Sequence, residues 1–341
     1  MKMPKSARHF YSGILLLWVI AVSGCSPTVP TQAPSESSVI SPQLSIPDTS
    51  TSAPITPSLT QQIVTTYASP LSSTTKSPTL LTPSQTQINT PTPMEDTRLT
   101  AYYWRNWPVI PTLSAQALQV FKHGQELGND LHAFSRIGDC QSVPAIFLGI
   151  YDTDRYWFDP EDTYLQSTIN QFLGSFQREN ITAKDGFGIS SVLTPLMSDP
   201  KLCQPTETPL DCEYRLHKPI IAFIAMGTNW KPNASASFER YLRLVVEFSI
   251  EHGVIPVMVT KADNIETNNL LNVSIAQVAY DYDMPLFNAW AAVQRLPNHG
   301  LEGDKIYLTT EAWDIRTFAG LKVLDAIWTS LKSELVPGLS P

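Results

Sequence analysis

Phe134-Ser135-Arg136-Ile137-Gly138-Asp139-Cys140-Gln141-Ser142 is the stretch of sequence that decides the fold. A partly apolar segment begins at Leu131 and breaks off at the Gly138-Asp139 pair, as a strand does when it reaches the edge of a sheet. A strand that stops at a glycine can turn sharply and lift the next side chain, here the thiol of Cys140, out of that edge. The stretch therefore predicts a nucleophile turn in an open α/β sheet.

Apolar runs and helical stripes alternate along the chain after this turn. Continuous apolar runs predict buried strands at 218–226, 254–260 and 285–288. Apolar residues at helical spacing predict helices at 114–122, 164–176, 238–248 and 275–282, and Thr309 or Thr310 caps a final helix. Strands that alternate with helices form a parallel sheet with helices on both faces.

Four short blocks, in the same order along the chain, resemble the blocks of the SGNH (GDSL) hydrolase family. Gly138-Asp139-Cys140 is similar to the first block, Gly-Asp-Ser, with cysteine at the serine position. Gly227-Thr228-Asn229-Trp230 is similar to the third block, Gly-x-Asn-Asp, with tryptophan at the aspartate position. The second block is a single glycine, for which Gly186 matches best and Gly188 is the alternative.

This resemblance covers about residues 131–335 and implies a flavodoxin-like three-layer sandwich with about five parallel strands. It also implies an ester (O-acyl) hydrolase in which Cys140 attacks the substrate. In the family the developing oxyanion is held by the amide of the nucleophile, by the block-two glycine and by the asparagine side chain. These roles fall here on the Cys140 amide, Gly186 and Asn229.

The fourth block of the family, Asp-x-x-His, is matched by Asp304-Lys305-Ile306-Tyr307, with tyrosine where the family has its histidine base. A phenol with a pKa of about 10 stays protonated at neutral pH and cannot accept the proton of a thiol. His299 lies nearby in sequence and is a candidate for a displaced base in a Cys140–His299 dyad. A solvated surface position for His299 is the alternative.

The N-terminal residues read as an export signal rather than as part of the fold. Residues 1–24 combine basic residues with a short apolar run, which predicts a signal peptide, and Val22-Ser23-Gly24-Cys25 resembles the lipobox of bacterial lipoproteins. Lipidation of Cys25 would anchor the protein to the extracytoplasmic face of the bacterial cell envelope. Residues 25–97, rich in Ser, Thr and Pro, predict a disordered tether, followed by the hydrolase-like domain at 98–341.

Charge and cysteine content narrow the partners. A formal net charge of −8, without a basic cluster, argues against nucleic acid. In an oxidising compartment Cys203 and Cys212, which flank a Pro-containing loop, are the expected disulfide, although pairing of either with Cys140 stays open. No metal-ligand spacing is visible, and we expect neither a metal nor another cofactor.

Two functions fit this pattern. The first is a membrane-anchored hydrolase acting on an O-acyl ester of a glycan or lipid, with Cys140 as nucleophile and a degraded triad. The second is a non-catalytic binding protein that uses the retained donors, and aromatic residues such as Trp230, to hold an envelope or extracellular glycan or acyl ligand.

Overall fold

The structure is a computed structural model that describes residues 96, 98–232 and 235–335. The chain divides into two units, residues 27–96 and the remainder, and the described residues other than Asp96 belong to the second unit. The predicted signal peptide, the predicted tether up to residue 95 and the predicted lipidation site at Cys25 lie outside the described residues.

Within the described part of the chain, four strands form one sheet in the order β1-β2-β3-β4, and every neighbouring pair is parallel. The strands span Asp130–Gly138 (β1), Pro219–Ala225 (β2), Ile255–Val259 (β3) and Leu286–Phe287 (β4). Residues of β2 and β3 are buried along their whole length, as the uninterrupted apolar runs predict for strands covered on both faces. At the carboxyl edge Gly138 pairs with Ala225, so the loops after β1 and β2 leave the sheet side by side.

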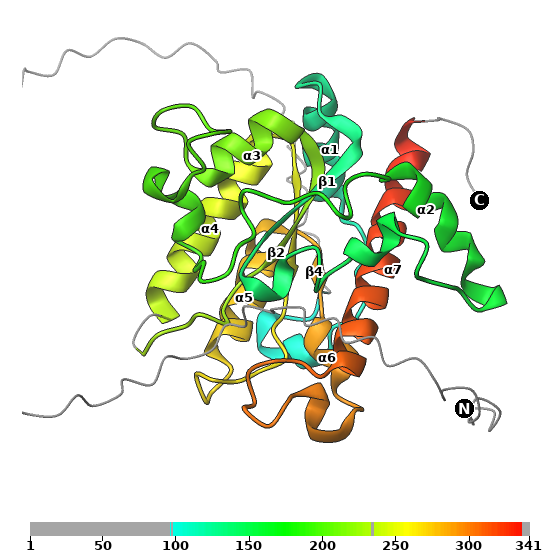
Figure 1. The fold of residues 1–341 in the computed structure, drawn as a ribbon, viewed down its shortest axis with the longest axis vertical. Coiled ribbons are helices and arrows are strands. Elements are labelled where there is room, and N and C mark those ends of the chain that lie inside the picture. The colour runs from blue at the N-terminus through cyan, green and yellow to red at the C-terminus, as the bar shows by residue number, and fades with distance from the viewer. Residues whose placement is uncertain (1–95, 97, 233–234, 336–341) are drawn as a thin grey trace, which may run out of the picture. The chain divides into compact units, whose positions relative to one another are not determined.

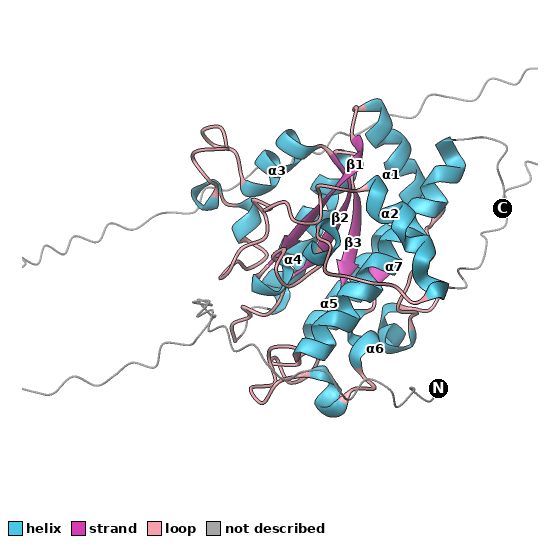
Figure 2. Cartoon of the chain, turned by 45° about the vertical axis from the view of Figure 1, so that its right-hand side comes forward, coloured by secondary structure: helices cyan, strands magenta, loops and turns pink. Residues whose placement is uncertain are grey.

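Helices cover both faces of this sheet (Figures 1 and 2). They span Ala115–Glu126 (α1), Gln166–Gln171 (α2), Pro209–His217 (α3), Ser235–Glu251 (α4), Leu270–Tyr282 (α5), Ala289–Val293 (α6) and Thr310–Leu335 (α7). In Figure 1, α3 and α4 lie to the left of the sheet and α2 and α7 to the right. The α/β fold with a parallel sheet between two helical layers is therefore as the sequence predicts.

Short 3-10 turns make up much of the remaining chain: Ala101–Asn106, Cys140–Ser142, Gly149–Asp152, Pro160–Leu165, Ser191–Leu193, Pro195–Met197 and Pro297–Gly300. One of them shortens a predicted helix, because Pro160–Leu165 precedes an α2 of only six residues. The helix predicted over 164–176 ends at Gln171, and Gly174, with a φ of +89°, is left-handed backbone through which a helix does not continue.

A fifth segment meets the sheet through a single parallel bridge between Gly138 and Ala183. The Gly138 amide donates to the carbonyl of Thr182, on the side of β1 opposite β2. If this segment is counted as an edge element, the order along the sheet is 2-1-3-4-5, which is the flavodoxin-like order. The sequence predicts about five strands, and the described residues contain four plus this bridge.

Buried charged side chains, rather than a continuous ladder of backbone hydrogen bonds, hold this edge segment against β1. Arg136, 1% exposed in β1, donates to the carbonyl of Phe176 at 2.8 Å and to Oδ1 of Asn180 at 2.8 Å. Glu213, 0% exposed in α3, accepts from Nδ2 of Asn180 at 2.7 Å and from the amide of Ile181 at 2.8 Å. These bonds fix the segment beside β1 although its backbone forms no continuous ladder with the strand.

The core between the layers is rich in aromatic rings. Phe134 of β1 contacts Phe172, Phe176 and Phe223 edge-on, with centroid distances of 5.8, 5.0 and 6.1 Å. Edge-to-face packing is the favourable geometry for such pairs.

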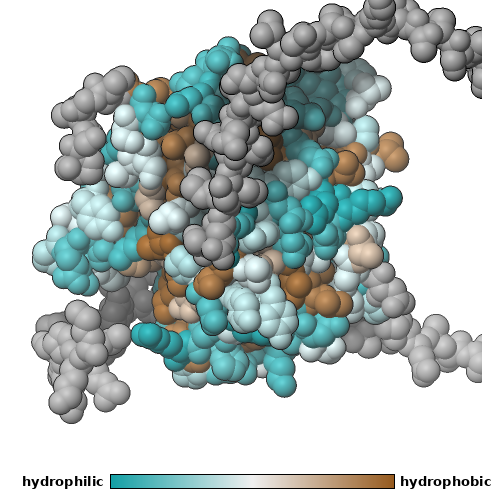
Figure 3. Space-filling view, turned by 180° about the vertical axis from the view of Figure 1, so that it is seen from behind, coloured by the Kyte–Doolittle hydropathy of each residue, from teal (hydrophilic) through white to brown (hydrophobic). Residues whose placement is uncertain are grey.

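On the face shown in Figure 3, hydrophobic residues are interspersed among hydrophilic ones. None of the helices in the described ranges is both long enough and apolar enough to span a bilayer.

Candidate active site

The turn after β1 is built so that only glycine fits at its start. A Cβ atom on Gly138 would lie 2.0 Å from Oγ of Ser142 and 2.8 Å from the carbonyl oxygen of Ala225. The chain then enters the 3-10 turn Cys140–Ser142, which Asp139 caps by accepting from the amide of Gln141 at 3.1 Å. Cys140 is 8% exposed and stands outside the disulfide. A sharp turn is thus present at the carboxyl edge of β1, as predicted, and the role of Cys140 as a nucleophile stays a prediction.

Asp139 also ties this turn to the loop after β2. Its Oδ1 atom caps the turn, and its Oδ2 atom accepts from the amide of Thr228 at 3.0 Å. Burial raises the pKa of Asp139, while the hydrogen bonds from Gln141 and Thr228 and the charge of Arg316 oppose that shift. The buried carboxyl group of Asp139 therefore holds the turn of Cys140 next to Thr228, the residue before Asn229.

Gln141 brings the third loop into the same place. Its Nε2 atom donates to Oγ1 of Thr228 at 3.0 Å and reaches the carbonyl oxygen of Ile306 at 3.5 Å. Thr228 and Ile306 are the direct neighbours of Asn229 and Tyr307 in sequence. A single side chain thus connects the loops that carry Cys140, Asn229 and Tyr307, at one edge of the parallel sheet.

Arg316 of α7 stabilises the turn Cys140–Ser142 through a hydrogen bond to its backbone. It is 6% exposed, and its guanidinium donates to the carbonyl of Gln141 at 2.7 Å and lies 4.3 Å from the centroid of the Phe147 ring. Burial lowers the pKa of Arg316 to about 10, and the negative charge of Asp139 opposes that shift. Arg316 was not predicted from the sequence, where an arginine on the apolar stripe of the last helix was the available signal.

A second group of buried charges follows β3. The side chain of Lys261 is 7% exposed, and its Nζ atom lies 2.8 Å from Asp263 and 2.7 Å from Glu266, whose side chains are each 1% exposed. Burial raises the pKa of Asp263 to about 6, against the charge of Lys261, which lowers it. A cavity of about 30 Å³, lined by Asp139, Lys261, Asp263 and Arg316 among others, separates this group from the nucleophile turn. That volume is enough for one water molecule.

Two of the candidate oxyanion donors, Asn229 and Gly186, lie in loops that are hydrogen-bonded to each other and line one groove. Nδ2 of Asn229 donates to the carbonyl of Phe187 at 2.9 Å, which joins the loop after β2 to the Gly186–Gly188 loop. The amide of Gly188 donates to Oγ of Ser191 at 3.1 Å. Gly186 has a φ of +79°, in the left-handed region that favours glycine. One of the two N–H groups on Nδ2 of Asn229 is thus engaged with a protein carbonyl, so a bond to an oxyanion would come from the second.

The loop with Asp304 and Tyr307 is organised by its own backbone. Oδ1 of Asp304 accepts from the amides of Ile306 and Tyr307 at 2.9 and 3.2 Å. The amide of Glu302 donates to the carbonyl of Tyr307 at 2.8 Å. The Asp304 carboxylate therefore shapes its own turn, in which Tyr307 is half-buried.

His299 occupies an exposed position in the turn Pro297–Gly300, with a φ of +55°. Its Nδ1 atom lies 3.3 Å from the carbonyl oxygen of Gln294, within the same loop. The ring thus makes its contact inside its own loop, and the Cys140–His299 dyad stays a prediction.

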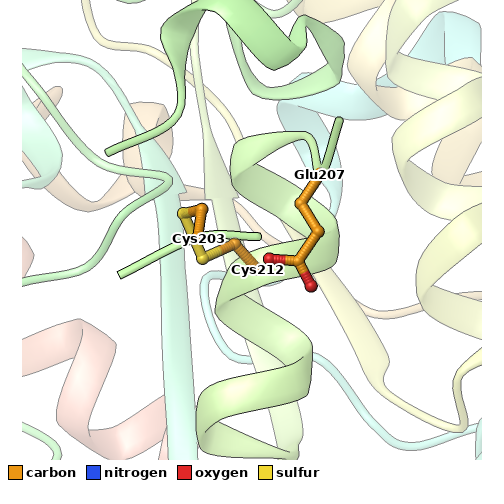
Figure 4. Close-up of side chains that lie close together, drawn as sticks. All are labelled: Cys203, Glu207 and Cys212. Atoms are coloured by element: carbon orange, nitrogen blue, oxygen red, sulfur yellow. A yellow bond between two sulfur atoms is a disulfide. The ribbon is translucent and has the colours of Figure 1, made fainter. Parts of the chain in front are cut away.

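Cys203 and Cys212 are joined in a disulfide, with their α-carbons 5.3 Å apart (Figure 4). Glu207 lies beside the two sulfur atoms, and its carboxylate pairs with Arg215. A metal ion would need the sulfur atoms as thiolates. With both sulfurs in the bond, this cluster offers a single carboxylate that is already paired.

No family model matches the chain, and neither does any curated protein. Among solved structures, a psychrotrophic esterase EstA from Pseudoalteromonas sp. aligns at 13% identity and a TM-score of 0.37, over 60% of this chain and 98% of that one. A lipase/acylhydrolase from Enterococcus faecalis aligns at 18% identity and a TM-score of 0.38, over 61% of this chain and 100% of that one. A GDSL-like lipase from Bacteroides thetaiotaomicron aligns at 12% identity and a TM-score of 0.38, over 62% of this chain and 99% of that one. Similarity at this level carries no argument about activity, which has to come from the residues of this chain.

Proposed function

We propose that the domain hydrolyses O-acyl esters with Cys140 as the nucleophile. The observation that carries the proposal is the pair of hydrogen bonds from Gln141 to Thr228 and to the Ile306 carbonyl, which join the loops of Cys140, Asn229 and Tyr307. A nucleophile beside several hydrogen-bond donors at the carboxyl edge of a parallel sheet is the arrangement that acyl transfer needs.

In the proposed reaction the sulfur of Cys140 attacks the carbonyl carbon of the ester. The carbonyl oxygen becomes an oxyanion, which the Cys140 amide, the Gly186 amide and Nδ2 of Asn229 stabilise. The bond to the alcohol oxygen then breaks, the thiol proton leaves with the alcohol, and the acyl group stays on sulfur as a thioester. Water attacks the thioester, releases the acid and returns the proton to Cys140.

The residue at the base position makes this a slow reaction. A phenol does not take up the thiol proton at neutral pH, so attack depends on the small thiolate fraction that a cysteine carries without a base. Loss of a triad base typically lowers the rate by several orders of magnitude. We therefore expect weak turnover that rises with pH as the thiolate fraction increases.

A second candidate function is ligand binding without catalysis. The observation that favours it is the Asp304 carboxylate, which accepts from the amides of Ile306 and Tyr307 and so is committed to its own turn. The retained donors, with Asn229 and Trp230 at the same edge, would then hold an envelope or extracellular glycan or acyl ligand without cleaving it.

The proposal includes a location. Lipid on Cys25, which the small residues before it support, would tether the domain to the extracytoplasmic side of a bacterial membrane. Cys25→Ala is expected to move the protein from the membrane fraction to the soluble fraction. Retention of the variant in the membrane fraction would contradict the lipid anchor.

A turnover assay with p-nitrophenyl acetate separates the two functions. Turnover by the wild type that Cys140→Ala abolishes supports the hydrolase. Silence of the wild type, with activity appearing in the double variant Cys140→Ser, Tyr307→His, supports an inactive site in an intact framework. Turnover that survives Cys140→Ala would show that Cys140 is not the nucleophile.

A further inference from the structure

A groove of about 590 Å³ lies directly beside the candidate oxyanion donors. The loop 186–191, the loop 227–231 and the first turns of α4 form its walls, and Asn229 is part of the lining. Its volume falls within the roughly 300–1,000 Å³ typical of small-molecule sites. Thr228 also lines the groove, and its hydroxyl accepts a hydrogen bond from Gln141 of the turn that follows β1. The groove is therefore adjacent to that turn.

The lining combines two kinds of side chain. Trp230, Phe238 and Tyr241 contribute aromatic rings. Ser190 and Ser191 contribute hydroxyl groups from the other loop. Aromatic surface and hydroxyl groups therefore meet in the same small space, next to a side-chain amide.

Trp230 adds an unmet hydrogen-bond donor. Its residue is half-buried, while its indole N–H is buried and has no acceptor in the part of the chain that the structure describes. A buried donor without an acceptor is unfavourable. In the resembled family this position is an aspartate, so a ring here is a property of this chain.

These features distinguish between the two kinds of ligand that an ester could present to the groove. An alkyl chain would cover the serine hydroxyls and the side chain of Asn229 without offering them any hydrogen bond, which is unfavourable. A pyranose ring has an apolar face of C–H groups that packs on an aromatic ring, and hydroxyl groups at its edge that both donate and accept. The mixed lining suits the sugar.

We propose that this groove binds a pyranose ring of a carbohydrate ester, packed on Trp230 and hydrogen-bonded by Ser190 and Asn229. The ring is the alcohol part of the ester, and this assignment rests on the hydrolase proposed above. Binding of the sugar itself does not require cleavage, so the groove also serves a catalytically silent protein. Trp230 is then a specificity-determining residue, selecting sugar esters over esters of long alkyl alcohols.

Isothermal titration calorimetry on the full chain carrying Cys140→Ala measures this binding without any chemistry. The probes are cellotriose, xylotriose and chitotriose, with octanoate as the alkyl probe. We expect at least one trisaccharide to bind, octanoate not to bind, and Trp230→Ala to weaken the trisaccharide by about tenfold or more. Trp157→Ala is the matched control, because Trp157 is 87% exposed and does not line the groove.

Three results would overturn the proposal: no trisaccharide binds, binding is unchanged in Trp230→Ala, or octanoate binds and loses affinity in that variant. The last result would assign the groove to the acyl chain instead. Ester turnover is measured separately with p-nitrophenyl acetate on the protein with Cys140 intact. Sugar binding without turnover removes the hydrolase and keeps the groove, and turnover without sugar binding does the reverse.

Discussion

Replacement of Asp139 by asparagine probes the connection between the nucleophile turn and the loop after β2. The carboxylate of Asp139 accepts from the amides of Gln141 and Thr228. An asparagine keeps one acceptor oxygen but turns an NH₂ group toward the other amide, so that two donors face each other. The change also removes the negative charge that partly balances the buried guanidinium of Arg316.

The cost of Asp139→Asn follows from these two losses. A buried amide left without its acceptor costs about 1–3 kcal/mol. Loss of the charge near Arg316 adds to this, but less than the roughly 3–5 kcal/mol of a broken buried ion pair, because that guanidinium keeps its bond to the Gln141 carbonyl. Neutralisation of a group whose pKa is raised by burial recovers part of the desolvation cost. We therefore predict a net loss of about 2–4 kcal/mol in the free energy of unfolding.

Urea unfolding of the full chain measures this loss, with Asp304→Asn as the matched control. Asp304 is exposed and uses only one oxygen, Oδ1, for the amides of Ile306 and Tyr307, a role that an asparagine oxygen can fill. The control is expected to change stability by less than about 0.5 kcal/mol. If Asp139→Asn unfolds at the same urea concentration as its control, Asp139 does not hold the two loops together.

Three further changes have defined outcomes. Glu213→Gln is expected to lower the free energy of unfolding by about 3–5 kcal/mol, because it removes a fully buried carboxylate that accepts hydrogen bonds from Asn180 and Ile181. A shift in urea midpoint no larger than that of an exposed Glu→Gln change would refute this. Asp263 has a folded pKa of about 6, above its unfolded value, so its folded form holds the proton more tightly and its contribution to stability falls as pH rises from about 4 to about 6. The stability of the wild type relative to Asp263→Asn should then fall by up to about 3 kcal/mol over that range, and a pH-independent difference would contradict it. Replacing Cys203 and Cys212 by serine opens a loop with a sequence separation of 9 and should cost about 2–3 kcal/mol, whereas an unchanged melting temperature would show that the bond does not stabilise the fold.

The sheet and its working edge were accessible from the sequence because they follow from local patterns. The short uninterrupted apolar runs that form β2 and β3 are typical of buried strands, and the glycine at the end of β1 indicated the turn that holds Cys140. Asn229 comes shortly after β2, so its loop was expected at the edge where parallel strands end, whereas Tyr307 was assigned to that edge by the family resemblance alone.

The edge segment beside β1 could not be predicted in the same way. Its partners are side chains distant in sequence, such as Arg136, which is 44 residues from Asn180, and Glu213, which is 33 residues from it. Periodicity describes which face of a segment is buried and carries no information about which charged group will meet its backbone. No strand was therefore predicted at 180–184, and a fifth strand was implied only by the family resemblance.

The framework of the candidate site was hidden for the same reason. Gln141 donates to Thr228 across 87 residues and reaches Ile306 across 165, and Arg316 reaches the Gln141 carbonyl across 175. The sequence pointed to the residues that resemble reacting groups, while the residues that hold them in place became visible only with the fold.

Mass spectrometry after a short pulse of p-nitrophenyl acetate measures most directly whether Cys140 is the nucleophile. We predict one acetyl group on the peptide that contains Cys140 in the wild type, lost again as the thioester hydrolyses, and none on that peptide in Cys140→Ala. Release of nitrophenol that Cys140→Ala leaves unchanged, with the acetyl group on another residue or on none, would contradict it.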